Sequence, residues 1–303
     1  MNKLITILGP TATGKTKIAA SLALEIGGEI ISADSRQVYQ NMDIGTGKDL
    51  NEYIIGDKEI PFHLVDIVNP GSEYNVFDFQ QDFLIAYDEI LKRGLNAILC
   101  GGSGLYLDSV LRAYEMSKVP ENNKLRDKLN KLTDQELVLH LNTYGKVHNT
   151  TDLTDRKRTL RAIEIIEFEK KHKAFNTKLK IIKSINFGIH FERQSLRERI
   201  TERLKARLSN GMVQEVEKLL NKGLKPEQLM FYGLEYRFVT QYVTGQISHD
   251  EMFIKLNTAI HQFAKRQMTW FRRMEKKGVK ILWIDGNLTL KEKLSIIQDK
   301  IRN

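Results

Sequence analysis

The stretch LITILGPTATGKT, residues 4–16, decides how the rest of this chain of 303 residues folds. An apolar run leads into GPTATGKT at 9–16, which matches the pattern G-x-x-x-x-G-K-[ST]. Residues 18–26 follow with helical spacing and many helix formers. A strand, a glycine loop and a helix in this order predict a loop whose backbone N–H groups surround a phosphate at the positive end of the helix dipole. The sequence therefore predicts polyphosphate binding, with an ordinary glycine turn as the alternative.

The end of this loop carries two side chains suited to phosphate chemistry. Lys15 can reach an outer phosphate, and the Thr16 hydroxyl can bind Mg²⁺. The loop residues expected to hold the phosphates are Gly9, Pro10, Thr11, Ala12, Thr13, Gly14, Lys15 and Thr16.

The composition is that of a globular protein, with 41% hydrophobic and 28% charged residues. The single cysteine, Cys100, excludes an intramolecular disulfide and a cysteine-based metal cluster, and we expect it to be a small buried side chain. No apolar stretch approaches the length of a membrane span, so we expect a cytoplasmic protein with no membrane partner. We also expect a monomer.

Charge is distributed unevenly along the chain. The net charge is +9, but residues 1–112 carry −6 and residues 113–277 carry +13. An acidic phosphate-binding region followed by a basic remainder indicates a polyanionic partner. The alternative is a set of Lys-rich helix faces exposed to water.

A second strand is expected at 29–34, ending in the polar cluster Asp34-Ser35-Arg36-Gln37. In an open parallel sheet, ligands lie beyond the carboxyl ends of the strands, so this cluster should lie near the phosphate loop. Asp34 could accept a proton from an incoming nucleophile or help to hold Mg²⁺ through water. Alternatively, Asp34 caps a following helix.

Further strands and helices are predicted downstream. An apolar stretch at 62–68 contains Asp66, which could be an outer metal residue or a buried, hydrogen-bonded carboxylate. A long amphipathic helix is expected from 73 to about 93, and a strand at 96–100. That strand runs into GGSGLY at 101–106, whose glycines permit close approach of a ligand and suggest the opposite wall of the same site.

Helical, Lys- and Arg-rich sequence replaces this pattern between 114 and 183. We interpret this region as a helical insertion in an α/β core formed by 1–113 and 184–303. At its centre Arg158 and Arg161 lie three residues apart and share a helix face. A basic helix exposed to solvent is the alternative.

Basic residues also recur in the last third of the chain. Arg199, Arg203 and Arg207 form a row on one face of a predicted helix, which suits pyrophosphate or, with the neighbouring glutamates, a surface ion-pair ladder. The helix around 261–273 mixes basic and aromatic residues, a mixture suited to RNA. We nevertheless expect Trp270 and Phe271 to be buried.

Six motifs together carry a family resemblance. They are GPTATGKT (9–16), DSRQVY (34–39), IGTGK (44–48), GGSGLY (101–106), DRKRTLRAIE (155–164) and QFAKRQMTWFR (262–272). In this order, over almost the whole chain, they resemble the tRNA dimethylallyltransferase (tRNA isopentenyltransferase) family. The resemblance implies a P-loop NTPase-like α/β core with a parallel sheet, plus a helical insertion domain that together with the core clasps a tRNA anticodon stem-loop.

The implied reaction moves a dimethylallyl group from dimethylallyl diphosphate to N6 of the adenosine just 3′ of the anticodon, with Mg²⁺ and without splitting ATP. By this resemblance Asp34 is the general base, and Lys15, Thr16 and Arg203 act on the diphosphate. The implied tRNA contacts are Asp34, Ser35, Arg36, Gln37, Ser103, Lys157, Arg158, Thr159, Leu160 and Arg161. The sequence departs from the family pattern at one place, Gly233-Leu234-Glu235-Tyr236. The family usually has Gly-Tyr-Lys/Arg-Glu there, so Glu235 stands where a basic residue is expected.

Three other functions fit parts of the sequence. An isopentenyltransferase acting on free adenine nucleotides would share the loops but would not need the basic region at 113–277. An ATP-dependent kinase could use the arginine row as a lid. An RNA-binding protein with a vestigial catalytic loop would not need the intact Gly14-Lys15-Thr16 and Asp34.

Overall fold

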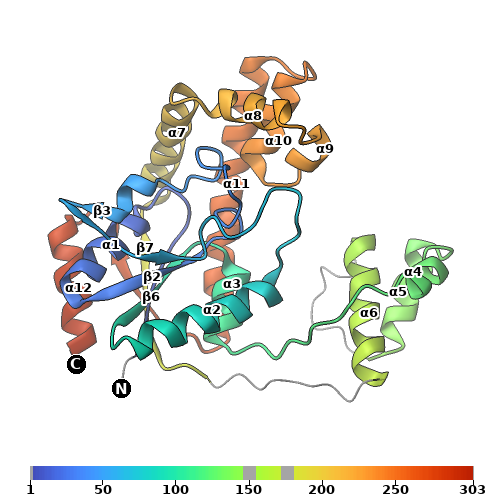
Figure 1. Cartoon of the computed structure of the whole chain (residues 1–303), viewed down its shortest axis with the longest axis horizontal. Coiled ribbons are helices and arrows are strands. Elements are labelled where there is room, and N and C mark those ends of the chain that lie inside the picture. Colours follow the sequence, from blue (N-terminus) through green and yellow to red (C-terminus); the bar gives the residue numbers. More distant parts are fainter. Residues whose placement is uncertain (1–2, 146–154, 172–180, 303) are drawn as a thin grey trace. The chain divides into compact units, whose positions relative to one another are not determined.

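Residues 1–113 and 180–303 form one unit of the computed structural model, the core unit, and residues 114–179 form a second, the insertion unit. The structure describes residues 3–145, 155–171 and 181–302. The core unit contains the phosphate loop and the predicted strands, and the insertion unit is helical where it is described (Figure 1).

A six-stranded parallel sheet lies at the centre of the core unit, with strand order β5-β2-β6-β1-β7-β8. Its strands are β1 (Leu4–Leu8), β2 (Gly28–Ala33), β5 (Phe62–His63), β6 (Asn96–Gly101), β7 (Ser184–His190) and β8 (Ile281–Asp285). All five residues of β1 are buried because this strand is central and helices cover both of its faces. Ile7 of β1 lies between Cys100 of β6 and Phe187 of β7. The loops that follow β1, β2 and β6 therefore leave the sheet at the same edge.

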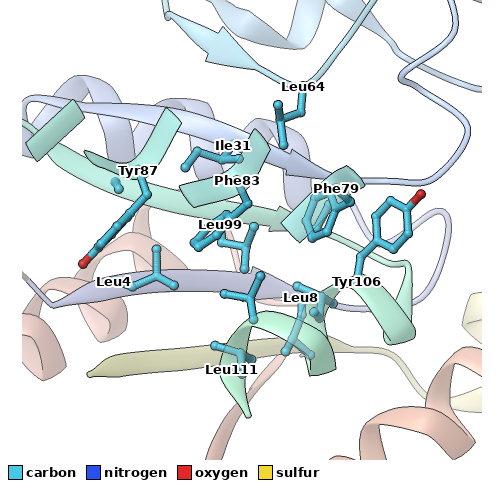
Figure 2. Close-up of a cluster of buried hydrophobic side chains, with 14 of the residues drawn as sticks. Leu4, Leu8, Ile31, Leu64, Phe79, Phe83, Tyr87, Leu99, Tyr106 and Leu111 are labelled. Carbon is cyan, nitrogen blue, oxygen red and sulfur yellow. The ribbon is translucent and has the colours of Figure 1, made fainter. Parts of the chain in front are cut away.

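Successive side chains of β1 point to opposite faces of the sheet. Leu4 and Leu8 pack against α2 (Val76–Lys92), α3 (Gly104–Leu111) and the end of α11 (His249–Lys276). In Figure 2 both leucines point into this cluster, where the rings of Phe79 and Tyr106 stack with their centroids 4.1 Å apart.

Ile5 and Ile7 instead pack against α1 (Lys15–Ile26) and α12 (Leu290–Arg302), on the opposite face (Figure 1). The apolar periodicity of β1 thus specifies both layers of the α/β core. Cys100 lies in this second layer, fully buried, which confirms its expected role as a small core side chain.

A third cluster is built from helices beside the carboxyl edge of the sheet. Its helices are α7 (Arg193–Ser209), α8 (Met212–Asn221), α9 (Pro226–Leu229), α10 (Leu234–Val243) and the first half of α11. Val38, Tyr39 and Met42, from the segment after β2, are buried in the same cluster. These helices therefore stand next to the loops that carry the predicted site.

The stretch predicted as a strand at 62–68 is a strand only at its first two residues, in β5. Leu64 (φ 62°) and Asp66 (φ 57°) adopt left-handed backbone conformations, which end the strand. The prediction was wrong because the apolar run does not reveal that Asp66 bends toward a partner on another loop. The sequence also did not predict the 3₁₀ helix Leu50–Tyr53 or the small hairpin of β3 (Ile54–Ile55) and β4 (Lys58–Glu59).

The insertion unit has a hydrophobic core of its own, formed by α4 (Asn123–Leu129), α5 (Asp134–Asn142) and α6 (Arg156–Lys171). Glu164 of α6 is buried and accepts two hydrogen bonds from Arg126, at 2.7 and 2.9 Å. The backbone N–H of Asn122 and the guanidinium of Arg161 donate to the same carboxylate, each at 2.9 Å. None of the helices described in either unit is both long and apolar enough to cross a bilayer.

Candidate active site

The phosphate loop leaves β1 and turns back into α1 with an unusual backbone. Gly14 has φ 73°, and Ala12 has φ 64°, a left-handed conformation that costs a residue with a side chain of order 1–3 kcal/mol. The Thr13 hydroxyl donates to the Pro10 carbonyl at 2.9 Å, and Arg199 Nε donates to the Ala12 carbonyl at 3.0 Å. Arg199 on α7 thus holds the strained turn in place.

Lys15 folds back over this loop, where its Nζ donates to the Pro10 carbonyl at 3.2 Å. Burial lowers the pKa of Lys15, and the nearby Arg203 lowers it further. A phosphate bound in the loop would offset both effects, because it would supply a partner for the buried ammonium group.

Asp34 lies directly after β2 and closes a turn, with Oδ1 accepting the Arg36 backbone N–H at 2.9 Å. The next helix described after Asp34 is the 3₁₀ helix at Leu50–Tyr53, so the alternative in which Asp34 caps a helix is wrong. The turn instead presents the carboxylate to the cavity that Lys15 and Thr16 also line.

One buried amide on α11 joins the phosphate loop to the glycine turn after β6. Gln267 Oε1 accepts the Thr11 backbone N–H at 2.9 Å, and its Nε2 donates to the Gly102 carbonyl at 2.8 Å. The Ser103 hydroxyl accepts the Ser35 backbone N–H at 2.9 Å. The loops after β1, β2 and β6 are therefore linked into one wall.

The arginine row of α7 faces this wall. Arg203 donates to the Thr11 hydroxyl at 3.2 Å and forms an ion pair with Asp49. Arg207 pairs with Glu235 of α10 at 3.2 Å. The neighbouring glutamates have other partners, since Glu198 accepts from Gln194 and Glu202 from Lys205. The surface-ladder alternative for the row is therefore wrong.

Glu215 of α8 holds the loop around IGTGK. Its carboxylate accepts the backbone N–H groups of Asp43, Ile44 and Gly45 at 2.8–2.9 Å, together with the Tyr236 hydroxyl at 2.6 Å. Four donors on one carboxylate fix this loop against the helices of the third cluster.

The same loop is held from its other end by Lys48, which is fully buried. Its Nζ donates to Asp43 at 2.6 Å, to the Tyr39 carbonyl at 2.8 Å and to Asp66. Asp66 is therefore hydrogen-bonded in an ion pair, as one of its two predicted roles required, but its side chain is partly exposed and not buried.

These elements enclose a cavity of about 460 Å³. Its lining combines cationic side chains (Lys15, Arg203 and Arg207), one predicted base (Asp34) and an apolar surface that includes Met230, Phe231, Leu234, Ile260 and Phe263. Cys100 also lines it, and burial raises the pKa of this thiol to about 12, so it stays protonated. The lining suits a ligand with an anionic head and an apolar body.

Most of the predicted residues of the core unit come together here: Thr11, Lys15, Thr16, Asp34, Ser35, Arg36, Gln37, Ser103 and Arg203 all line the cavity. Gly9, Pro10, Ala12, Thr13 and Gly14 shape the loop but do not line the cavity. The sequence did not indicate the structural role of Gln267, although this residue lies in the motif QFAKRQMTWFR. It carries no signal for Glu215 either.

The residues predicted on α6 of the insertion unit differ in exposure. Lys157 and Arg158 are exposed. Thr159 and Leu160 are buried in the insertion unit itself, which argues against contact between RNA and these two side chains. Arg161 donates to Glu164 and to the Val119 carbonyl at 2.6 Å, so it also stabilises the insertion unit.

The predicted burial of the two adjacent aromatic residues on α11 holds for Phe271, which is fully buried. Trp270 is partly buried, packed against the same core and close to Gly104. The aromatic residue of this helix that reaches the cavity is Phe263.

Comparison with known proteins places these features in a family. Residues 37–274 match the family model described as IPP transferase. The tRNA dimethylallyltransferase 2 of Bacteroides fragilis is 51% identical over 299 residues, which cover 99% of this chain and 98% of that protein. The protein of the same name from Phocaeicola vulgatus is 53% identical over 294 residues, covering 97% and 96%.

Solved structures of similar fold also come from dimethylallyl- or isopentenyltransferases. The full-length tRNA isopentenylpyrophosphate transferase of Bacillus halodurans superposes with a TM-score of 0.72 at 30% identity, covering 100% of this chain and 96% of that chain. A eukaryotic dimethylallyltransferase, described as acting on tRNA, shares the fold with a TM-score of 0.80 at 21% identity, covering 100% of this chain and 80% of that one. This chain therefore belongs to the IPP transferase family.

Proposed function

We propose that this protein transfers a dimethylallyl group from dimethylallyl diphosphate to N6 of the adenosine immediately 3′ of the anticodon in tRNA. One observation carries the proposal: Lys15 and Thr16 of the phosphate loop line the same cavity as Asp34 and Arg203, and this cavity also has an apolar surface. The names of the relatives, tRNA dimethylallyltransferase, support both the donor and the acceptor.

The chemistry requires a leaving group and a base. The adenine amine attacks the allylic carbon, a C–N bond forms, and the C–O bond to the diphosphate breaks with its electron pair going to oxygen. The loop amides, Lys15 and Arg203 stabilise the charge that develops on the pyrophosphate. An exocyclic amine is a weak nucleophile, and Asp34 would accept the proton that it loses.

The residues in the cavity also fit Mg²⁺. The Thr16 hydroxyl and the Asp34 carboxylate line the same space, and Mg²⁺ typically takes one or two protein oxygens together with phosphate oxygens and water. No group of three or more His, Cys, Asp or Glu suited to a metal occurs among the described residues, so the donor's phosphates would complete the coordination. When bound, the ion would neutralise charge on the pyrophosphate.

The acceptor base must reach the cavity. Bases of an anticodon loop are unpaired, so turning one out of the stack costs little. The exposed Phe231 at the cavity, with the Arg36 guanidinium 5.8 Å from its ring centre, provides a cationic and aromatic surface of the kind that contacts RNA loops.

The test uses purified protein, dimethylallyl diphosphate, Mg²⁺ and an anticodon stem-loop with adenosine 3′ of the anticodon. Mass spectrometry should show one dimethylallyl group added to this RNA, and none added to the same stem-loop with guanosine at that position. Adenosine monophosphate should be a far poorer acceptor. Equal or better transfer to the free nucleotide, or transfer that requires ATP, would contradict the proposal.

A further inference from the structure

Two arginines of α7 converge on Gly47. A Cβ atom at residue 47 would lie 1.3 Å from Arg207 Nη2 and 2.9 Å from Arg203 Nη2, so the two guanidinium groups are close neighbours. Gly47 has φ 64°, a conformation that favours glycine, and its missing side chain leaves the space that Arg207 occupies. Both arginines line the cavity that contains the phosphate loop.

Burying the charged guanidinium of Arg207 beside Gly47 costs free energy. The residue is only 9% exposed, and its Nε has no hydrogen-bond partner among the described residues. Burial, followed by the proximity of Arg203, lowers the pKa of Arg207. A buried cation beside a second cation is unfavourable unless anions lie close to both, and a buried donor without a partner adds to this cost.

Each arginine has one carboxylate partner in this structure. Arg203 pairs with Asp49, and Arg207 pairs with Glu235 at 3.2 Å. These carboxylates offset the two positive charges while no anion is bound. A guanidinium presents several donors in a fixed plane, so it can keep one carboxylate partner and still bind a phosphate oxygen.

We propose that Arg207 is a second arginine ligand of the pyrophosphate, acting beside Arg203, and that Glu235 positions it. This inference rests on the proposed function, in which the pyrophosphate is the leaving group. As the C–O bond breaks, the two guanidinium groups share the charge that appears on the departing oxygen, and both keep their protons. The acidic residue at position 235, where the family usually has a basic one, then has a structural reason, because Glu235 forms an ion pair with Arg207.

The experiment measures pyrophosphate binding by calorimetry in the presence of Mg²⁺ and without RNA. Arg207→Met should weaken binding by roughly tenfold to a hundredfold, as expected for the loss of a hydrogen-bonded charge partner. The double variant Arg207→Met with Glu235→Met should show the same loss and keep its melting temperature, because replacing a buried ion pair with apolar residues is often neutral or stabilising. Lys205→Met is the matched control, since Lys205 is an exposed cation on the same helix.

Two outcomes would overturn the inference. The first is a folded double variant that binds pyrophosphate as tightly as wild type, which would show that the pair is only structural. The second is a single variant that loses affinity for the anticodon stem-loop but not for pyrophosphate, which would make Arg207 an RNA contact. Pyrophosphate binding that depends on Arg207, in a protein that prenylates no stem-loop, would instead contradict the proposed function and leave this inference standing.

Discussion

At the scale of single residues, Asp34 has two separable properties, an acceptor oxygen for the turn and a carboxylate that can take a proton. Asp34→Asn keeps an oxygen for the Arg36 backbone N–H but cannot accept a proton at neutral pH. We expect normal folding and stem-loop affinity, with single-turnover transfer slower by roughly a hundredfold to ten-thousandfold. Asp34→Ala, which also removes the turn contact, serves as the comparison. An Asn variant that transfers at the wild-type single-turnover rate would remove Asp34 from the mechanism.

At the scale of elements, we expect the contact between α8 and the loop around IGTGK to affect both stability and activity. Glu215→Gln replaces one of the two acceptor oxygens with an amide nitrogen, which would face the backbone N–H groups of Asp43 and Ile44 or that of Gly45. We expect the free energy of unfolding to fall by roughly 1 kcal/mol, the scale for losing hydrogen bonds to partly buried donors. Turnover should fall too, because the Gly47 carbonyl on this loop accepts from Gln37 at 3.0 Å and from Arg203 at 3.4 Å.

The control for this prediction is Glu217→Gln, which makes the same change at an exposed position of α8. Chemical denaturation and steady-state kinetics would be measured for both variants. An unchanged KM for the donor in a destabilised Glu215→Gln protein would show that the loop holds the fold but not the donor site.

Elements with strong local signals could be predicted from the sequence, and contacts between distant elements could not. The strand and loop at 4–16 and the arginine row of α7 are local patterns, and the structure contains both. The sequence left two roles open for that row, since the choice depends on what lies opposite Arg203, about 190 residues from Thr11 along the chain. Gln267 illustrates the limit, because a single amide gains its role only when β1 and β6 are adjacent.

At the scale of the whole molecule, positive charge is concentrated between residues 113 and 277, which carry +13, whereas residues 1–112 carry −6. If the exposed face of α6 binds RNA, Arg158→Ala should weaken stem-loop binding and reduce the slope of log affinity against log salt by up to about one. Arg161→Ala should instead lower the stability of the insertion unit, because its guanidinium holds Glu164 and the Val119 carbonyl. Affinity for the stem-loop that does not respond to Arg158→Ala at any salt concentration would contradict this role.

Both units should lose stability in acid, because each contains a buried carboxylate that accepts hydrogen bonds from basic side chains. Burial alone would raise the pKa of Glu29 in the core unit, but hydrogen bonds from His63 and Arg93 outweigh it and hold this pKa below its usual range. In the insertion unit, burial alone would likewise raise the pKa of Glu164. Hydrogen bonds, of which that from Arg126 has the largest effect, outweigh burial and lower this pKa. When the pKa is lower in the folded state, ionisation of the carboxylate stabilises the fold at pH values above the unfolded-state pKa of about 4.3. This stabilisation is lost as the pH falls through the folded-state pKa.

This loss of stability can be measured unit by unit, because both tryptophans, Trp270 and Trp283, lie in the core unit. Tryptophan fluorescence then follows the core unit alone, whereas far-UV circular dichroism follows the helices of both. Glu164→Gln should destabilise the insertion unit at neutral pH by roughly 1–3 kcal/mol, the cost of breaking charged hydrogen bonds, and the difference from wild type should vanish at low pH. It should shift the dichroism transition and leave the fluorescence transition in place, while Asp127→Asn, an exposed change on α4, should shift neither. A fluorescence shift as large as the dichroism shift would show that the two units unfold as one cooperative body.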